Sequence, residues 1–155
     1  MSYLVIKWLH VVSAAALLGT GAGIAYFLVR ARASADARVV ARVCGDVVLA
    51  DLLFTTPAVI VQPLTGFAML HVASIPFATS WVRASFILYV AVGCCWLPVL
   101  CLQWRMWRLA RDAVALGTDL PPRFFRLYRA WFLLGVPAFA GVLAIFWLMI
   151  AKPAF

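Results

Sequence analysis

Two histidines, His10 and His71, carry the most specific chemistry in this chain. A neutral imidazole binds transition metals and haem iron, so two imidazoles at one depth could hold such an ion between them. Each histidine lies inside a long apolar run, His10 in residues 3–29 and His71 in residues 47–73. At ~1.5 Å of helix per residue, His10 is ~10 Å from the start of the first run and His71 is ~5 Å from the end of the second. The two rings meet at one level if these runs form neighbouring antiparallel helices.

Two cations are expected near the histidines. Lys7 precedes His10 by one helical turn and shares its face, and Arg83 lies at the start of the third apolar run. Haem b fits this pattern, with iron between His10 and His71 and its propionates directed to Lys7 and Arg83. Aromatic side chains at this level could line the macrocycle or form an interfacial belt: Trp8, Phe77, Trp81 and Tyr89. The alternatives are cations that only reach the membrane boundary, separate structural histidines, and a proton-relay or metal-transport role.

The elements that position these residues are membrane-spanning helices. Apolar residues make up 67% of the chain and charged residues 12%, about half of the ~25% found in soluble domains. Each apolar run reaches the ~20 residues that a helix needs to cross a bilayer. We therefore predict an all-α membrane protein, an antiparallel bundle of four transmembrane helices in one domain, 1–155. The predicted helices are 3–29, 47–74, 81–106 and 128–151.

The first run is predicted to be a retained helix rather than a signal peptide. No basic segment precedes it, and it exceeds the ~7–15 apolar residues of a typical signal.

The positive charge orients the bundle. The net charge is +8. Most of the positive residues lie in the connections between helices one and two and between helices three and four, which the positive-inside rule places in the cytoplasm. Both termini are then periplasmic, and the chain is a multi-pass protein of the bacterial inner membrane. This distribution predicts contact with the lipid bilayer and argues against a nucleic-acid partner. The residues that carry it are Arg30, Arg32, Arg38, Arg42, Arg105, Arg108, Arg111, Arg123, Arg126 and Arg129.

The second helix carries a polar stripe. Its helical pattern starts at Val39, before the lipid, and Pro57 and Pro63 are expected to kink it. Because His71 lies nine residues beyond Gln62, the two share a face only if the kink at Pro63 rotates the outer segment. The stripe expected to face the bundle interior contains Asp51, Thr55, Ala58, Gln62, Thr65 and Met69.

An aspartate within a membrane span needs a partner. Arg105 or Arg129 is predicted to pair with Asp51 and fix the helix register, and a proton or ion relay is the alternative. In the first helix, Gly19 and Gly23 form a small-xxx-small pair. This pair predicts tight packing inside the bundle, with a homo-oligomer interface as the alternative.

Several segments resemble a family of bacterial integral membrane proteins whose function is not known. The resemblance covers nearly the whole chain and implies four helices without supplying an activity. The segments that carry it are Leu53-Phe54-Thr55-Thr56-Pro57, Gln62-Pro63-Leu64-Thr65-Gly66, Trp96-Leu97-Pro98, Leu120-Pro121-Pro122-Arg123 and Ala151-Lys152-Pro153.

The first helix also resembles two characterised groups. The run Lys7-Trp8-Leu9-His10-Val11, followed by Ser13 and Gly19, is similar to the opening helix of HemJ-type protoporphyrinogen oxidases and to a helix of CopD-type copper-resistance proteins. The HemJ resemblance implies a haem or porphyrin held by His10. That family has a Trp-x-His-x-Lys arrangement in its third helix, where this chain has Trp81, Arg83 and Ser85, so the match is incomplete there.

These observations predict a haem b protein with His10 and His71 as axial ligands, acting in electron transfer or redox chemistry with a quinone or another redox partner. A HemJ-like protoporphyrinogen oxidase is one alternative. A cofactor-free structural or copper-transport component is the other, with Met69 near His71 as the soft ligand. Whether the chain is itself an oxidoreductase stays open.

Overall fold

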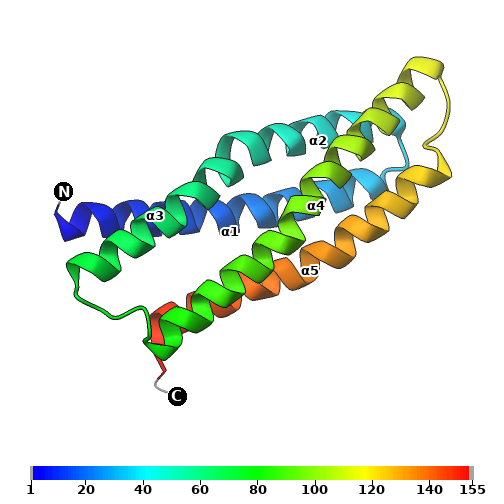
Figure 1. Ribbon diagram of the computed structural model, residues 1–155. Coiled ribbons are helices and arrows are strands. Elements are labelled where there is room, and N and C mark those ends of the chain that lie inside the picture. Colours follow the sequence, from blue (N-terminus) through cyan, green and yellow to red (C-terminus); the bar gives the residue numbers. More distant parts are fainter. Residues whose placement is uncertain (1, 154–155) are drawn as a thin grey trace.

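The computed structural model describes residues 2–153 as a set of long helices without strands (Figure 1). Helix α2, the π-helix η1 and helix α3 run on without a break, so four helical spans are long and apolar enough to cross a membrane. The prediction of an all-α bundle with four membrane-spanning helices is thus confirmed. The elements are α1 (Tyr3–Ala33), α2 (Ala37–Ala50), η1 (Asp51–Thr55), α3 (Thr56–Val72), α4 (Ser80–Leu116) and α5 (Pro122–Ala151).

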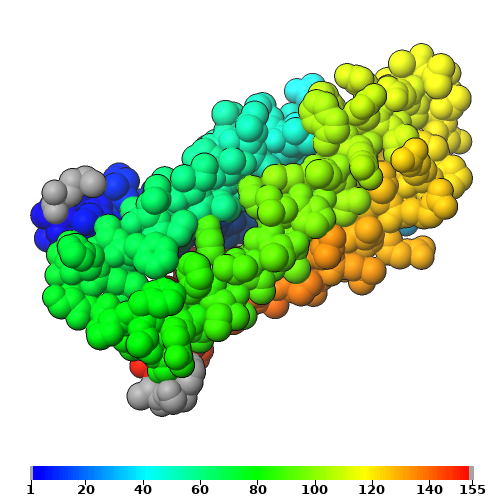
Figure 2. All heavy atoms as spheres, viewed as in Figure 1, coloured from blue at the N-terminus to red at the C-terminus, as the bar shows by residue number. Residues whose placement is uncertain are grey.

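The molecule has two ends of different character. We call the end that holds the connections 34–36 and 117–121 the arginine end, and the end that holds the connection 73–79 the histidine end. The space-filling view shows an elongated molecule, with the yellow atoms of the α4–α5 turn at one end and the blue atoms of the start of α1 at the other (Figure 2). The start of α1 and the end of α5 both lie at the histidine end (Figure 1).

The helices extend further at the arginine end than the apolar runs predicted. The reason is that apolar length reports the lipid-embedded part of a helix, whereas alanine and arginine keep the following turns helical outside it. Asp36 caps α2 by accepting a hydrogen bond of 2.8 Å from the backbone N–H of Arg38. Gly117 ends α4 in the left-handed conformation, with φ of 65°. The expectation that the chain is already helical at Val39 is confirmed by the start of α2 at Ala37.

The arginine end is a closed four-helix bundle with a buried core. Here α1 packs against α2, α2 against α4, α4 against α5, and α5 against α1. Gly45 of α2 lets Trp107 of α4 approach closely, since a Cβ built on Gly45 would lie 3.0 Å from the indole nitrogen. The guanidinium of Arg32 lies 5.8 and 5.7 Å from the ring centroids of Phe125 and Tyr128. Each helix supplies at least one fully buried side chain to the core, and the largest of these are Leu28, Val40, Cys44, Met106 and Phe124.

At the histidine end the bundle opens into two arms (Figure 1). One arm is α1 packed on α3, and the other is α4 packed on α5. Each arm is tight within itself. A Cβ built on Gly66 of α3 would lie 3.4 Å from the ring of His10, and one built on Gly141 of α5 would lie 2.6 Å from Val92 of α4. The separation is therefore between the arms and not within them.

Side chains that reach across hold the two arms together. Pro63 has no N–H to donate to the carbonyl of Val59 one turn earlier, and the hydroxyl of Tyr89 on α4 donates to that carbonyl instead. Three phenylalanines form a second bridge, with ring centroids 5.5 to 5.9 Å apart. They are Phe67 of α3, Phe77 of the connection and Phe86 of α4.

The predicted intrachain packing of Gly19 and Gly23 is wrong. No atom of the described residues lies within 4 Å of a Cβ built at either position. The inward face of α1 in this region is set instead by Ile24, Leu28 and Ala31, which are buried at helical spacing. The glycines lie beside that face, and a homo-oligomer interface through them stays a prediction.

Candidate functional site

His10 is held in a defined orientation between α1 and α3. Its Nδ1 lies 2.9 Å from the hydroxyl oxygen of Thr65. That hydroxyl has one proton, which it donates to the backbone carbonyls of Val61 at 2.7 Å and Gln62 at 3.1 Å. With its proton on these carbonyls, the oxygen of Thr65 accepts from His10 in the tautomer that carries the ring hydrogen on Nδ1. The other nitrogen, Nε2, keeps its lone pair and is chemically ready to bind an electron-pair acceptor.

The surroundings of His10 explain why the sequence places small residues there. Gly66 leaves room for the imidazole, whose Cε1 would lie 3.4 Å from a Cβ on that glycine. Ser13 is buried one turn further along α1 and donates a hydrogen bond of 3.0 Å to the backbone carbonyl of His10. The ring is half-buried. Thr65 and Gly66 thus hold the imidazole from one side. In metal sites, a hydrogen-bond partner on one ring nitrogen commonly orients a histidine ligand in the same way.

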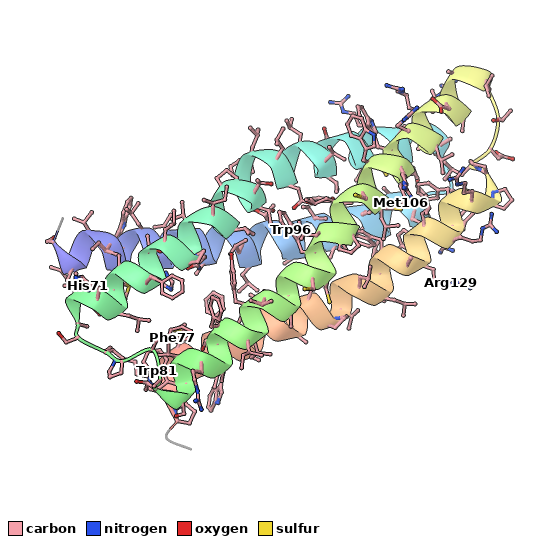
Figure 3. All side chains as sticks on the ribbon, in the orientation of Figure 1. His71, Phe77, Trp81, Trp96, Met106 and Arg129 are labelled. Atoms are coloured by element: carbon pink, nitrogen blue, oxygen red, sulfur yellow. The ribbon has the colours of Figure 1, made fainter. Side chains whose placement is uncertain are left out.

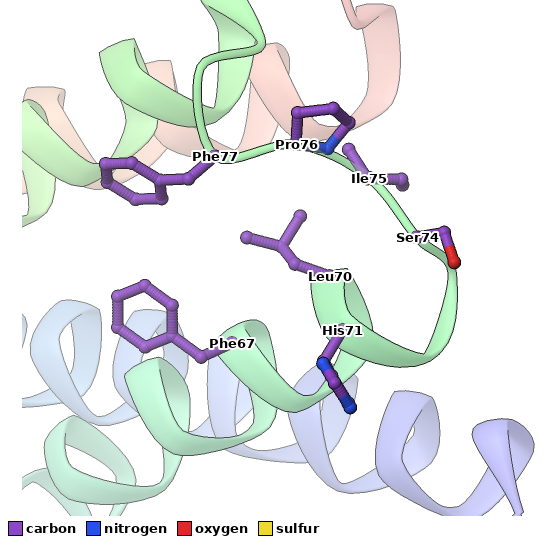
Figure 4. A pocket seen from close by; sticks show the side chains of 7 residues that line it. All are labelled: Phe67, Leu70, His71, Ser74, Ile75, Pro76 and Phe77. Atoms are coloured by element: carbon purple, nitrogen blue, oxygen red, sulfur yellow. The ribbon is translucent and has the colours of Figure 1, made fainter.

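His71 lies on the same arm but on a different side of α3. It is five residues beyond Gly66, which on a helix of 3.6 residues per turn is about 140° around the axis. The residue is exposed and lies at the rim of an open cavity of about 450 Å³. Figure 4 shows its imidazole pointing away from the rings of Phe67 and Phe77. The structure thus places both histidines at the histidine end but does not put them in contact.

The two predicted cations lie on different arms. Lys7 is exposed on α1, one turn before His10 on the same helix. Arg83 is exposed near the start of α4, and α4 packs on α5 and α2, whereas α1 packs on α3, α2 and α5. The structure therefore groups Lys7 with His10, and it places Arg83 across the opening from them.

A metal site made of protein ligands alone is not formed within residues 2–153. No group of three or more His, Cys, Asp or Glu side chains there is close enough to hold a metal ion. Haem differs because its four pyrrole nitrogens already bind the iron, and the protein supplies only one or two axial ligands.

The predicted ion pair between Asp51 and Arg105 or Arg129 is wrong. Both arginines are exposed, and the ion pairs within the described residues join Arg42 to Asp46 and Arg111 to Asp112. The physical reason is helical phase. Gln103 of α4 faces Asp51, so Arg105, two residues further on, points about 200° away from it.

Instead, Asp51 belongs to a buried polar group that we call the Asp51 cluster, formed by Asp51, Thr55, Trp96 and Gln103. The last three surround the carboxyl group of Asp51. Trp96 lies midway along α4, with Met106 closer to the arginine end (Figure 3). The relative exposures of Asp51, Thr55 and Gln103 are only 4, 6 and 3%. The predicted interior stripe is confirmed at Asp51, Thr55 and Ala58, which are all buried.

The partners on α4 were not identified from the sequence. Trp96 and Gln103 are seven residues apart, two turns of one helix face, and both polar groups lie in an otherwise apolar span. This seven-residue spacing is the signal in the sequence that could have identified the two residues as partners of Asp51. The pairing with Asp51 also depends on η1, where the backbone N–H and hydroxyl of Thr56 both donate to the carbonyl of Asp51, the hydroxyl at 2.9 Å. The π-helix directly precedes Pro57, which has no N–H, and such turns recur at functional sites.

Comparison with known proteins identifies the family. Residues 4–153 match a family described as predicted integral membrane protein (DUF2269). The chain belongs to this family. Neither the curated proteins nor the solved structures contain a significant match to it. Membership agrees with the four membrane-spanning helices and with the exposure of most large apolar side chains, which lipid covers in a membrane protein.

Proposed function

We propose that this DUF2269 protein binds haem b at the histidine end and works in electron transfer or redox chemistry there. One observation carries the proposal: the hydrogen bond between Nδ1 of His10 and Thr65 leaves Nε2 with a free lone pair. Membrane-embedded histidines that bind haem iron use such a nitrogen, and a partner on the other nitrogen fixes the ring.

We assign the residues at this end different roles in holding the cofactor. His10 would bind the iron, and His71, which lies about 140° around α3 from Gly66, would bind it only if the outer turns of α3 rotate. The open cavity of about 450 Å³ beside His71 is of the size that cofactor sites have. Lys7 and Arg83, one on each arm, would bind the two propionates. When bound, haem would supply one-electron transfer, and the chain's residues would hold and orient it.

Orientation follows from the arginines. We propose that the arginine end lies in the cytoplasm and that both termini and the haem lie on the periplasmic side of the bacterial inner membrane. A quinone or another redox partner would meet the protein from the bilayer or the periplasm. A periplasm-dependent enzyme reporter fused to the C-terminus should be active on this orientation and inactive on the reverse one.

An absorption spectrum of the detergent-purified protein, oxidised and then reduced with dithionite, tests the cofactor. A Soret band with sharp low-spin features on reduction is expected. His10→Ala should remove the haem, and His71→Ala should convert it to a high-spin, five-coordinate form. A colourless protein from cells supplied with haem would refute the proposal. A low-spin spectrum unchanged by both substitutions would refute the site.

A further inference from the structure

The Asp51 cluster lies outside the proposed haem site and contains the one buried carboxyl group among the described residues. The chain has no glutamate, and its acidic residues are five aspartates. Since the other four are exposed, Asp51 alone is taken out of water. The exposed ones are Asp36, Asp46, Asp112 and Asp119.

Three oxygen atoms in this cluster are buried without a hydrogen-bond partner, and one of them is Oγ1 of Thr55. Oδ2 of Asp51 and Oε1 of Gln103 are both buried without a partner, although the two side chains are neighbours. An ionised carboxylate and an amide oxygen are both acceptors, so neither can satisfy the other. The side chains around the carboxyl group, Thr55, Trp96 and Gln103, are neutral, and a low-dielectric interior strongly disfavours an ionised carboxylate without a positive charge beside it. A protonated carboxyl group carries no charge, and its O–H can donate to Oε1 of Gln103.

No charged side chain balances an ionised Asp51. Between His10 and Tyr26, α1 has no titratable residue, and α3 has none before His71. On α2, the exposed Asp46 is already paired with Arg42. The other titratable groups nearby are Cys44 of α2 and, on the stretch of α4 from Tyr89 to Arg105, Tyr89, Cys94, Cys95, Cys101 and Arg105. None of these carries a positive charge toward Asp51, because Arg105 is exposed on another face.

We propose that the Asp51 cluster is a proton-binding site within the membrane-spanning part of the protein. One proton from water bonds to a carboxylate oxygen of Asp51, and the resulting O–H donates to Oε1 of Gln103. The indole N–H of Trp96, which also lacks an acceptor, donates to the other carboxyl oxygen. A single proton neutralises the site, whereas a divalent cation would leave a net positive charge among apolar helices.

Isotope-edited infrared spectroscopy of the full-length protein tests this site. Protein labelled with carboxyl-¹³C aspartate should show one protonated carboxyl band at neutral pH, and that band should come from Asp51. Asp51→Asn keeps the shape and the hydrogen bonds and should remove that band completely. Asp46→Asn, the matched change at an exposed position of α2, should leave it unchanged. The spectrum of the labelled wild-type protein decides whether a protonated aspartate is present even where a variant fails to accumulate.

Other outcomes would overturn the proposal. An Asp51 that stays ionised from neutral to mildly acidic pH would show no such band. Loss of the band on adding sodium, but not choline, would assign the site to a metal cation instead of a proton. Gln103→Leu removes the acceptor and should shift the band. A band unaffected by this substitution would refute the hydrogen bond from Asp51 to Gln103.

Discussion

The arginine end and the histidine end are built from the same four spans but are stabilised in different ways. At the arginine end all the spans meet around fully buried side chains such as Met106 and Phe124. At the histidine end two helix pairs diverge and are joined by the hydrogen bond from Tyr89 to Val59 and by half-exposed aromatic rings. Stability is concentrated at one end, and the residues with chemistry, His10 and His71, lie at the other.

The contrast has a physical basis in the bilayer. Lipid tails are as apolar as leucine, so apolar area alone does not drive helices together in a membrane. Close packing of side chains drives helix association instead, and it requires small residues and complementary helix surfaces. At the arginine end such packing joins the two helix pairs, as at Gly45 of α2 against Trp107 of α4, whereas at the histidine end it acts within each arm, at Gly66 and Gly141. Regions with few buried contacts between elements are the ones that rearrange most easily.

The largest expected effect compares one phenylalanine from each end. Phe124→Ala removes a fully buried ring and should lower the free energy of unfolding by about 3–5 kcal/mol. Phe77→Ala removes a ring that is 44% exposed and should cost less than half as much. Unfolding of both variants in mixed micelles with increasing denaturing detergent measures the difference. Equal losses would contradict the contrast between the ends.

The second prediction concerns ligand binding at the histidine end and rests on the proposed haem. Thr65→Val keeps the side-chain shape but leaves Nδ1 of His10 without its partner. Loss of such a partner should reduce haem affinity about 10–100-fold. Haem titration followed by absorbance measures this. Thr56→Val, which alters a hydrogen bond within η1, should leave the affinity unchanged, and an equal loss there would argue against a specific role of Thr65.

The third prediction tests the bridge between the arms. Tyr89→Phe removes the hydroxyl that donates to the Val59 carbonyl, and it should lower stability by about 1 kcal/mol. Distances between spin labels on α3 and α4 should also broaden at the histidine end and stay unchanged at the arginine end. Tyr26→Phe is the control, because Tyr26 is 62% exposed on α1. An unbroadened distance distribution would show that the aromatic cluster alone holds the arms.

The smallest effect is expected at the surface of the arginine end. Arg42 and Asp46 form an ion pair with an N–O distance of 3.8 Å between side chains that are 84 and 66% exposed. Because water screens such pairs, Arg42→Gln should change the free energy of unfolding by no more than about 0.5 kcal/mol. A larger loss, seen in the same detergent titration, would mean that surface charge and not the buried core stabilises this end.

The sequence alone determined the number of spans and much of the buried face of the second one. Apolar length requires four helices because a backbone in lipid must satisfy its own hydrogen bonds. Helical spacing placed Asp51, Thr55 and Ala58 on one face, and burial confirms it. It also marked Pro63 as a break in the hydrogen-bond ladder, although the donor that repairs the break, Tyr89, lies 30 positions from Val59.

What the tertiary structure decided is which residues meet. Sequence spacing gave Asp51 an arginine partner, but helix rotation presents Gln103 and Trp96 to it and turns Arg105 outward. Likewise, two histidines at similar depth are separated by their angle around α3, while Thr65 becomes the partner of His10. Depth follows from counting residues along one helix. Contact between helices depends on their rotation and on the divergence of the two arms, which only packing fixes.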